Sequence, residues 1–388
     1  MARKKVYPNI AYDDNKQLFY ITLYYGLDSN GKPKKASKTA KTITEAKRIL
    51  KEHECKRTAG AACAPSSLQL SEYVETYIDF KSGSLQPTTI YGYKNIAKHI
   101  QTFFQRKKLQ SITAVDLRKY VKYLQTLGLS NNSINKHIAL LKSVFTSAKR
   151  DSLIPQNPAE FLDNLRTENI DRSCYNAQQI NDLCKSVQGT SLEIPVLLGA
   201  YLGLRRGEIL GLTWDHVDFE SKQLTIASTV TKAGAQRIEK EPKTKKSYRT
   251  LAIPDLLCSK LAAQKKRLES LFQCNHQIER HNYVVFLDKG TPFSPNYLTS
   301  KFHEHLEKLG LEPIRFHDLR HSFASISYAA GVPLSETSSA LGHASTAVTA
   351  AVYTHEFTPV KATAVNAVYQ ALCDVSDNSS TQHTSCSQ

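Results

Sequence analysis

The sequence predicts a multidomain α+β protein with a small N-terminal β-sheet plus helix, a helical bundle, and a mainly helical third domain that contains a small antiparallel sheet. The chain of 388 residues is long enough for about two to four domains, and 41% hydrophobic residues suffice for their cores. Apolar residues alternate over residues 17–25 and recur at helical spacing over residues 68–165. Short stretches of small or polar residues separate these regions. We therefore expect domains over residues 1–60, 67–165 and 172–375, and a disordered tail over residues 376–388.

The first 60 residues predict a small sheet followed by a helix. The alternating apolar residues of 17–25 would lie on one face of a strand. Asn30-Gly31 is a strong turn signal, and the basic stretch 32–41 would form a second strand or a loop. Thr42 and Glu45 have the spacing of a capping box, so a helix is expected directly after them.

The region of residues 68–165 predicts four amphipathic helices, which would pack as a compact bundle. The first is marked by three aromatic residues, Tyr73, Tyr77 and Phe80. The third would begin at Thr113, where Asp116 has the capping spacing, and would end near Gly128.

The third region predicts helices with a short inserted sheet. Residues 223–226 and 249–254 have strand character, and the basic segment 232–246 between them would be a long loop or hairpin. The apolar run 283–286 is interpreted as a further strand.

The formal charge of +16 is unevenly distributed along the chain. Residues 1–165 carry a net charge of +14, whereas residues 166–388 carry only +2. A cationic field of this kind favours a polyanionic partner such as nucleic acid, although a merely soluble basic surface would have the same composition.

Other features of the composition bear on the class of protein. The sequence contains no run of about 18 apolar residues, so no membrane span is predicted. The N-terminus lacks the apolar core of a secretory signal, so we do not expect one. The eight cysteines include no CxxC pair, so we expect reduced thiols in a cytoplasm and no membrane partner.

Four segments of the third region contain residues suited to chemistry on an anion. They are Gly203–Glu208, Pro242–Arg249, Phe316–His321, and Leu341–His343 with Tyr353–His355. Taken singly, each also fits a structural role: an internal ion pair, a solvated basic loop, a surface histidine–arginine pair, and a packed tyrosine.

Two of these segments suggest specific pairs. Arg205, expected on a helix after an apolar stretch, needs an acidic partner or an anion, and Glu208 is three residues away. His317 and Arg320 would share one helical face, which would place a proton carrier beside a bidentate phosphate ligand.

Taken together, the four segments indicate a kind of phosphodiester chemistry that no single segment indicates. Two arginines, a lysine, two histidines and a tyrosine without a carboxylate cluster exclude a two-metal nuclease, which needs acidic ligands. The same set fits metal-free attack by a tyrosine on a phosphodiester, with cationic donors that stabilise the transition state.

In this order and spacing, the four segments resemble the tyrosine recombinases, the phage-integrase family. The resemblance implies an arm-type DNA-binding domain like that of lambda-type and conjugative-transposon integrases, then a core-binding (SAM-like helical) domain and a catalytic domain. It also implies site-specific recombination through a 3′-phosphotyrosyl intermediate and a Holliday junction, which would integrate and excise a mobile element without ATP, metal or cofactor.

The resemblance assigns roles to six residues. Arg205, which follows Gly-Leu as in the family, and Arg320 would clamp the scissile phosphate, and Tyr353 would attack it. The remaining three would act on protons: Lys243 would protonate the leaving 5′-oxygen, His317 would orient or accept the tyrosine proton, and His343 would donate to the phosphate. Three other lysines in the same loop remain alternatives to Lys243, namely Lys240, Lys245 and Lys246.

The resemblance also implies partners. The chain would bind double-stranded DNA at core sites and arm-type sites and would act as a homotetramer in a bacterial cytoplasm. An amphipathic helix over residues 358–373 would dock on a neighbouring protomer, and accessory DNA-bending or directionality proteins are expected.

Two alternative functions fit the same residues. A type IB topoisomerase shares the arginines, the lysine and the tyrosine, but it usually carries a lysine where this chain has His317, and a separate basic N-terminal domain suits a second DNA site. A non-catalytic DNA-binding repressor or architectural protein would instead tolerate the loss of the Tyr353 hydroxyl.

Overall fold

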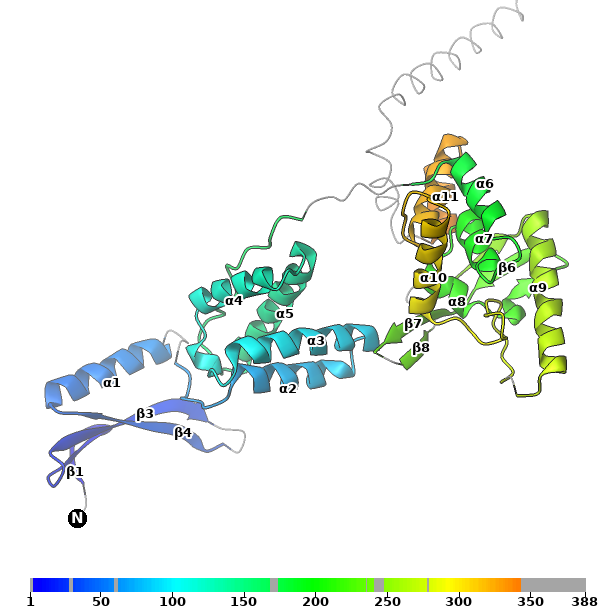
Figure 1. Cartoon of the computed structure of the whole chain (residues 1–388). Helices are drawn as coiled ribbons and strands as arrows, with labels where there is room; N and C mark the ends of the chain where they lie inside the picture. Colours follow the sequence, from blue (N-terminus) through cyan, green and yellow to red (C-terminus); the bar gives the residue numbers. More distant parts are fainter. Residues whose placement is uncertain are drawn as a thin grey trace, which may run out of the picture. The chain divides into compact units, whose positions relative to one another are not determined.

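The computed structural model describes most of the chain as two compact units, residues 1–170 and 171–388, and each is described here by itself (Figure 1). The described residues are 3–27, 31–58, 62–167, 174–234, 236–240, 248–277 and 279–342. Within these ranges, none of the helices has the length and apolar character that a bilayer crossing requires.

The first unit begins with a four-stranded antiparallel sheet and a helix that packs on one of its faces (Figure 1). The strands, in the order β1-β2-β3-β4, are Lys4–Tyr7, Ile10–Asp13, Leu18–Leu27 and Pro33–Ala40, and the helix α1 is Ile43–Thr58. Ile21 and Leu23 of β3 and Leu50 of α1 belong to their common core. The predicted strand and helix are confirmed, but two additional strands precede them; Asn30 of the predicted turn lies outside the described residues.

Half of the predicted capping box of α1 is present: the Thr42 side chain caps the helix, but the Glu45 carboxylate binds the amide of Lys41 and not that of Thr42. The Glu45 amide donates to Thr42 Oγ1 at 3.2 Å, and the Lys41 amide donates to Glu45 Oε2 at 3.3 Å. These bonds satisfy amides at the start of the helix and fix where it begins.

The other face of the sheet is polar and aromatic. Tyr20, Thr22 and Tyr24 alternate with the core residues of β3, and they pair in register with Thr39, Ser37 and Lys35 of β4. Because side chains alternate along a strand, these residues project away from the face that α1 covers.

The rest of the first unit is the predicted helical region. Its elements are α2 (Leu70–Ser82), α3 (Pro87–Phe104), a 3₁₀ turn η1 (Leu109–Ser111), α4 (Ala114–Thr126) and α5 (Asn131–Arg150). The Thr113–Asp116 capping box is present, and Tyr73 lies in the core. Phe80, however, is 78% exposed near the end of α2, so its aromatic spacing did not predict burial.

The second unit is mainly helical. Its helices are α6 (Ala177–Ser186), α7 (Glu193–Leu202), α8 (Arg206–Gly211), η2 (Trp214–His216), α9 (Asp255–Cys274), α10 (Pro295–Lys308), α11 (Asp318–Ala329) and α12 (Leu334–Leu341). A three-stranded antiparallel sheet has the order β5-β6-β9, from Val217–Asp218, Gln223–Ile226 and Arg249–Ala252. A separate antiparallel hairpin consists of β7 (Thr229–Ala233) and β8 (Gln236–Lys240).

These elements confirm the predicted α+β class and most of the predicted strands. The prediction of a strand over residues 283–286 is wrong. These residues form only isolated bridges, Thr213 with Tyr283 and Phe286 with Pro292. The run is apolar because Val284, Val285 and Phe286 are buried, and periodicity alone cannot tell a buried apolar loop from a buried strand.

Candidate active site

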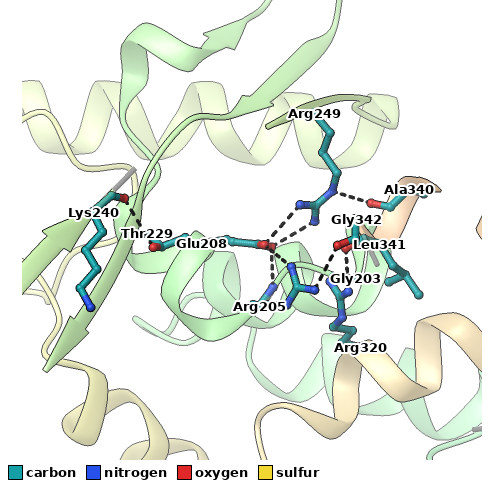
Figure 2. A network of polar contacts seen from close by, with 10 residues as sticks. All are labelled: Gly203, Arg205, Glu208, Thr229, Lys240, Arg249, Arg320, Ala340, Leu341 and Gly342. Carbon is teal, nitrogen blue, oxygen red and sulfur yellow. Dashed lines mark hydrogen bonds and ion pairs between the residues drawn. The ribbon is translucent and has the colours of Figure 1, made fainter. Parts of the chain in front are cut away.

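Arg205 lies at the start of α8, in the turn that follows α7. The sequence predicted that it would lie on a helix, but it is the residue that precedes the helix, and its side chain is 35% exposed. Its amide donates to Glu208 Oε2 at 2.9 Å and its Nη1 donates to Glu208 Oε1 at 2.7 Å. The predicted partnership of Arg205 with Glu208 is therefore confirmed (Figure 2).

Glu208 also binds a second arginine, Arg249 at the start of β9 (Figure 2). Arg249 Nη1 donates to Oε1 at 3.2 Å and Nη2 donates to Oε2 at 3.0 Å, a bidentate arrangement. Burial of Glu208, which is 2% exposed, acts to raise its pKa, but the hydrogen bonds and charges of Arg249 and Arg205 prevail and the pKa is lowered. The carboxylate therefore stays ionised between the two arginines.

Arg320 is a buried arginine of α11, 2% exposed. Its Nη1 donates to the carbonyl oxygen of Gly203 at 2.8 Å, and its Nη2 donates to that of Leu341 at 2.6 Å. Its guanidinium is thus fixed between the end of α7 and the end of α12.

The end of α12 contacts all three arginines. Three successive carbonyl oxygens accept hydrogen bonds there: Ala340 from Arg249 Nε (2.6 Å), Leu341 from Arg320, and Gly342 from Arg205 Nη2 (3.2 Å) (Figure 2). The last carbonyls of a helix have no partner within the helix and carry partial negative charge. They are therefore natural acceptors for guanidinium groups.

Gly203 makes this approach possible. It ends α7 in the left-handed conformation, with φ of 61°. A Cβ at this position would lie 2.5 Å from Leu341 Cδ2 and 2.8 Å from Phe323 Cδ1. A glycine is needed here for both the backbone conformation and the contact of α7 with α12.

His317 precedes α11 directly, and its ring lies 5.2 Å from that of His321 in an edge-on arrangement. Desolvation of the ring by the surrounding protein lowers the pKa of His317, and the positive charges of Arg320 and Arg205 lower it further. His317 lies one turn before Arg320, whose amide donates to the His317 carbonyl oxygen at 3.2 Å. The neutral form of His317, which can accept a proton, is favoured beside these charges.

The structure thus brings together three of the six predicted site residues: Arg205, His317 and Arg320. The other three, Lys243, His343 and Tyr353, lie outside the described residues, as do the alternatives Lys245 and Lys246. Lys240 is described at the end of β8, and its side chain does not point toward the arginines (Figure 2).

Arg249 was not predicted as a site residue. In the sheet it is paired with the buried Ile226 and lies two residues before Leu251, so it belongs to the inward-facing side of β9. An arginine at an apolar position of a predicted strand was the signal that could have identified it.

The arrangement suits a phosphate. Arg205, Arg249, Arg320 and Glu208 together carry a net charge of +2, and part of Arg205 is exposed. Among residues with a described position, no cluster of three or more histidines, cysteines and acidic residues could hold a metal ion.

Comparison with known proteins identifies the family. The model of the phage integrase family matches residues 174–358, and that of the phage integrase SAM-like domain matches residues 69–166. The chain belongs to the phage integrase family. It is a tyrosine recombinase, an enzyme of site-specific DNA cleavage and rejoining.

Two curated relatives are similar over most of this recombinase. A tyrosine recombinase XerC-like protein of Caldanaerobacter subterraneus is 26% identical over 390 residues, which is 94% of this chain and 98% of the relative. The ICEBs1 integrase of Bacillus subtilis is 28% identical over 262 residues, 67% of this chain and 71% of the relative.

Solved structures share the fold of the recombinase. The Tn1549 transposon integrase in complex with a circular intermediate DNA has a TM-score of 0.66 at 18% identity and covers 78% of this chain and 100% of its own. A lambda integrase tetramer bound to a Holliday junction has a TM-score of 0.59 at 16% identity and covers 92% of this chain and 99% of its own. The comparisons give no support to the topoisomerase alternative.

Proposed function

We propose that this recombinase cleaves double-stranded DNA by attack of the Tyr353 hydroxyl on a scissile phosphate. The new bond joins the tyrosine oxygen to phosphorus, the bond to the 5′-oxygen breaks, and the products are a 3′-phosphotyrosyl link and a free 5′-hydroxyl. The observation that carries this proposal is the convergence of Arg205 and Arg320 on adjacent carbonyls at the end of α12, beside His317.

In this mechanism Arg205 and Arg320 bind the non-bridging oxygens of the phosphate. As the tyrosine attacks, the phosphoryl group gains negative charge, and guanidinium groups already held in place stabilise it without rearrangement. Their fixation by Glu208 and by helix-end carbonyls supports such a preorganised role.

The proton transfers are assigned to the other three residues. The lowered pKa of His317 keeps its imidazole neutral, which is the form that can accept or orient the tyrosine proton. Lys243 protonates the leaving 5′-oxygen, and His343 donates a hydrogen bond to the phosphate.

Rejoining is the reverse reaction with a different strand. A 5′-hydroxyl of the partner duplex attacks the phosphotyrosine, and the tyrosine leaves as the restored phenol. The covalent link conserves the phosphodiester energy, so ATP is not required. Two such exchanges pass through a Holliday junction and integrate or excise a mobile element.

We assign residues 1–60 to arm-type DNA sites and residues 67–165 to core sites. The sheet face that α1 leaves uncovered presents hydroxyl, aromatic and cationic groups. Arg3 lies over the ring of Tyr20, with 3.7 Å from its Cζ to the ring centroid, and Lys35 lies over that of Tyr24, with 5.2 Å from its Nζ. Such a face suits phosphates and base edges of a DNA groove.

The active assembly would be a homotetramer on DNA, in which residues 358–373 dock on a neighbouring protomer. Lambda integrase has been solved as a dimer bound to a core site and as a tetramer bound to a Holliday junction, which supports this assignment. Accessory DNA-bending or directionality proteins would set the direction of recombination.

A trapped covalent intermediate tests the function. A nicked duplex that carries the core site loses a short strand after cleavage, so the protein–DNA adduct accumulates. We expect peptide mapping to place the DNA on Tyr353, and we expect Tyr353→Phe to bind the duplex as tightly as the wild type but form no adduct. An adduct on another residue, or full activity of Tyr353→Phe, would contradict the proposal.

A further inference from the structure

We infer that Arg249 is a positioning residue of the phosphate clamp, and that it acts on Arg205 through the carboxylate of Glu208. By phosphate clamp we mean Arg205 and Arg320, the two arginines that bind the scissile phosphate in the proposed function, and the inference rests on that function. Arg249 itself has little access to DNA, since its side chain is only 8% exposed.

The two arginines share both oxygens of one carboxylate. Oε1 accepts from Arg205 Nη1 (2.7 Å) and Arg249 Nη1 (3.2 Å), and Oε2 accepts from the Arg205 amide (2.9 Å) and Arg249 Nη2 (3.0 Å). A rigid guanidinium fork on one side thus sets the plane of the carboxylate that holds Arg205 on the other.

Arg249 also connects this carboxylate to α12. Its Nε donates to the Ala340 carbonyl at 2.6 Å, while Arg205 Nη2 reaches Gly342 in the same turn. The position of Arg205 relative to the end of α12 is therefore determined twice, by its own bond and through the Glu208–Arg249 pair.

The third contribution of Arg249 is charge. With Arg249 present, the negative charge of Glu208 is divided between two arginines, and Arg205 keeps a positive potential toward the phosphate. Without Arg249, Glu208 would be neutralised by Arg205 alone. The net charge of the cluster of three arginines and Glu208 would fall from +2 to +1 while the transition state gains negative charge.

The test measures single-turnover adduct formation on the nicked core-site duplex by full-length protein. We expect Arg249→Met to slow cleavage about 10- to 100-fold, by analogy with the loss seen when a group that orients a metal ligand is removed. Arg249→Lys, which keeps the charge but loses the fork, should fall between Arg249→Met and the wild type. Arg206→Met is the matched control, since Arg206 is adjacent to Arg205 but donates to Thr299 and Pro295.

A second substrate separates positioning of the clamp from loss of folded protein. A methylphosphonate at the scissile position lacks the negative charge that the clamp neutralises. Most of the Arg249→Met deficit should therefore disappear on this DNA, as it should for Arg205→Ala. The ratio of rates on the two substrates is measured within one preparation and does not depend on its active fraction.

The inference is overturned if Arg249→Met cleaves ordinary DNA at the wild-type rate, if its deficit is unchanged on methylphosphonate DNA, or if Arg206→Met behaves in the same way. Failure of the proposed function has a different signature: the wild type itself would form no adduct on Tyr353. The two failures are therefore distinguishable in one set of reactions.

Discussion

Arg205 and Arg320 are held by different acceptors, and this difference determines what their removal does. Arg205 shares Glu208 with Arg249, so Arg205→Ala leaves the carboxylate paired. Arg320→Ala instead leaves the carbonyls of Gly203 and Leu341 without this buried donor. We expect both variants to slow cleavage by roughly 10²-fold or more, as for removal of a preorganised donor. Only Arg320→Ala should also lower stability, by about 1–3 kcal/mol for each unpaired group. Single-turnover cleavage and thermal denaturation measure the two effects, and equal losses of stability would contradict this distinction.

His137 gives a residue-scale prediction for pH. It is buried in the helical region, 4% exposed, and its Nδ1 lies 2.9 Å from the Tyr120 hydroxyl oxygen. Burial, and then the charge of His99, lower its pKa to about 4. The folded-state pKa of His137 lies below its unfolded value, so burial of the neutral ring is compatible with full stability above about pH 6.5. Stability is lost as the pH falls toward 4, because the unfolded chain then binds a proton at His137 that the folded chain does not. The loss should reach about 3 kcal/mol in the helical region.

Hydrogen exchange of α4 and α5 in the intact chain measures this loss. His137→Gln should flatten the acid dependence, whereas the same substitution at the exposed His276 should leave it unchanged. An acid dependence that His137→Gln does not alter would assign it to other groups.

The sequence allowed Arg205, His317 and Arg320 to be predicted as one group because their motif spacing is characteristic of the family. It did not predict Arg249, because its partner Glu208 is 41 residues away and the pair depends on how β9 meets α8. It also could not indicate the acceptors at Ala340, Leu341 and Gly342, because main-chain oxygens are present in every residue type.

At the scale of elements, the junction of α7 and α12 requires Gly203. We expect Gly203→Ala to destabilise the second unit by about 2–5 kcal/mol, from a left-handed alanine together with overpacking against Leu341 and Phe323. Cleavage should also fall, because the Gly203 carbonyl holds Arg320.

Gly189→Ala is the matched control for this prediction. Gly189 also has a positive φ, 72°, but a Cβ there would meet no atom within 4 Å. It should cost only about 1–2 kcal/mol, the penalty of the left-handed conformation. Equal denaturation midpoints for the two variants would show that the contact with α12 is unimportant.

Elements with strong local signals could be predicted well. The helical periodicity and the Thr42 and Thr113 caps located α1 and α4. The strands β1 and β2 were missed because each has four residues and β1 is exposed along its whole length, so neither shows a clear alternation. Residues 283–286 were misassigned because burial in a loop makes a run as apolar as burial in a sheet.

At the scale of the whole molecule, the N-terminal and catalytic regions should be separable in function. We expect removal of residues 1–60 to weaken binding at arm-type sites and reduce its salt dependence, while core-site cleavage persists. Lys35→Ala, on the uncovered sheet face, should reduce the slope of log affinity against log salt by about one if Lys35 contacts one phosphate. Lys51→Ala, on α1, removes the same charge elsewhere in the domain and is the control. Unchanged affinity of the truncated protein at every site would refute the arm-type assignment.

The carbonyls at the end of α12 have a consequence for how inactive mutants should be distributed. No side chain of Ala340, Leu341 or Gly342 takes part in the three bonds, so Ala340 can change in type while the geometry is retained. Leu341 is constrained by its burial, and Gly342 by its left-handed conformation, with φ of 65°. A proline or an insertion within α12 would displace all three oxygens together. A screen for loss of recombination should therefore find such backbone-altering lesions in this helix, together with replacements of Leu341 and Gly342, but few replacements of Ala340.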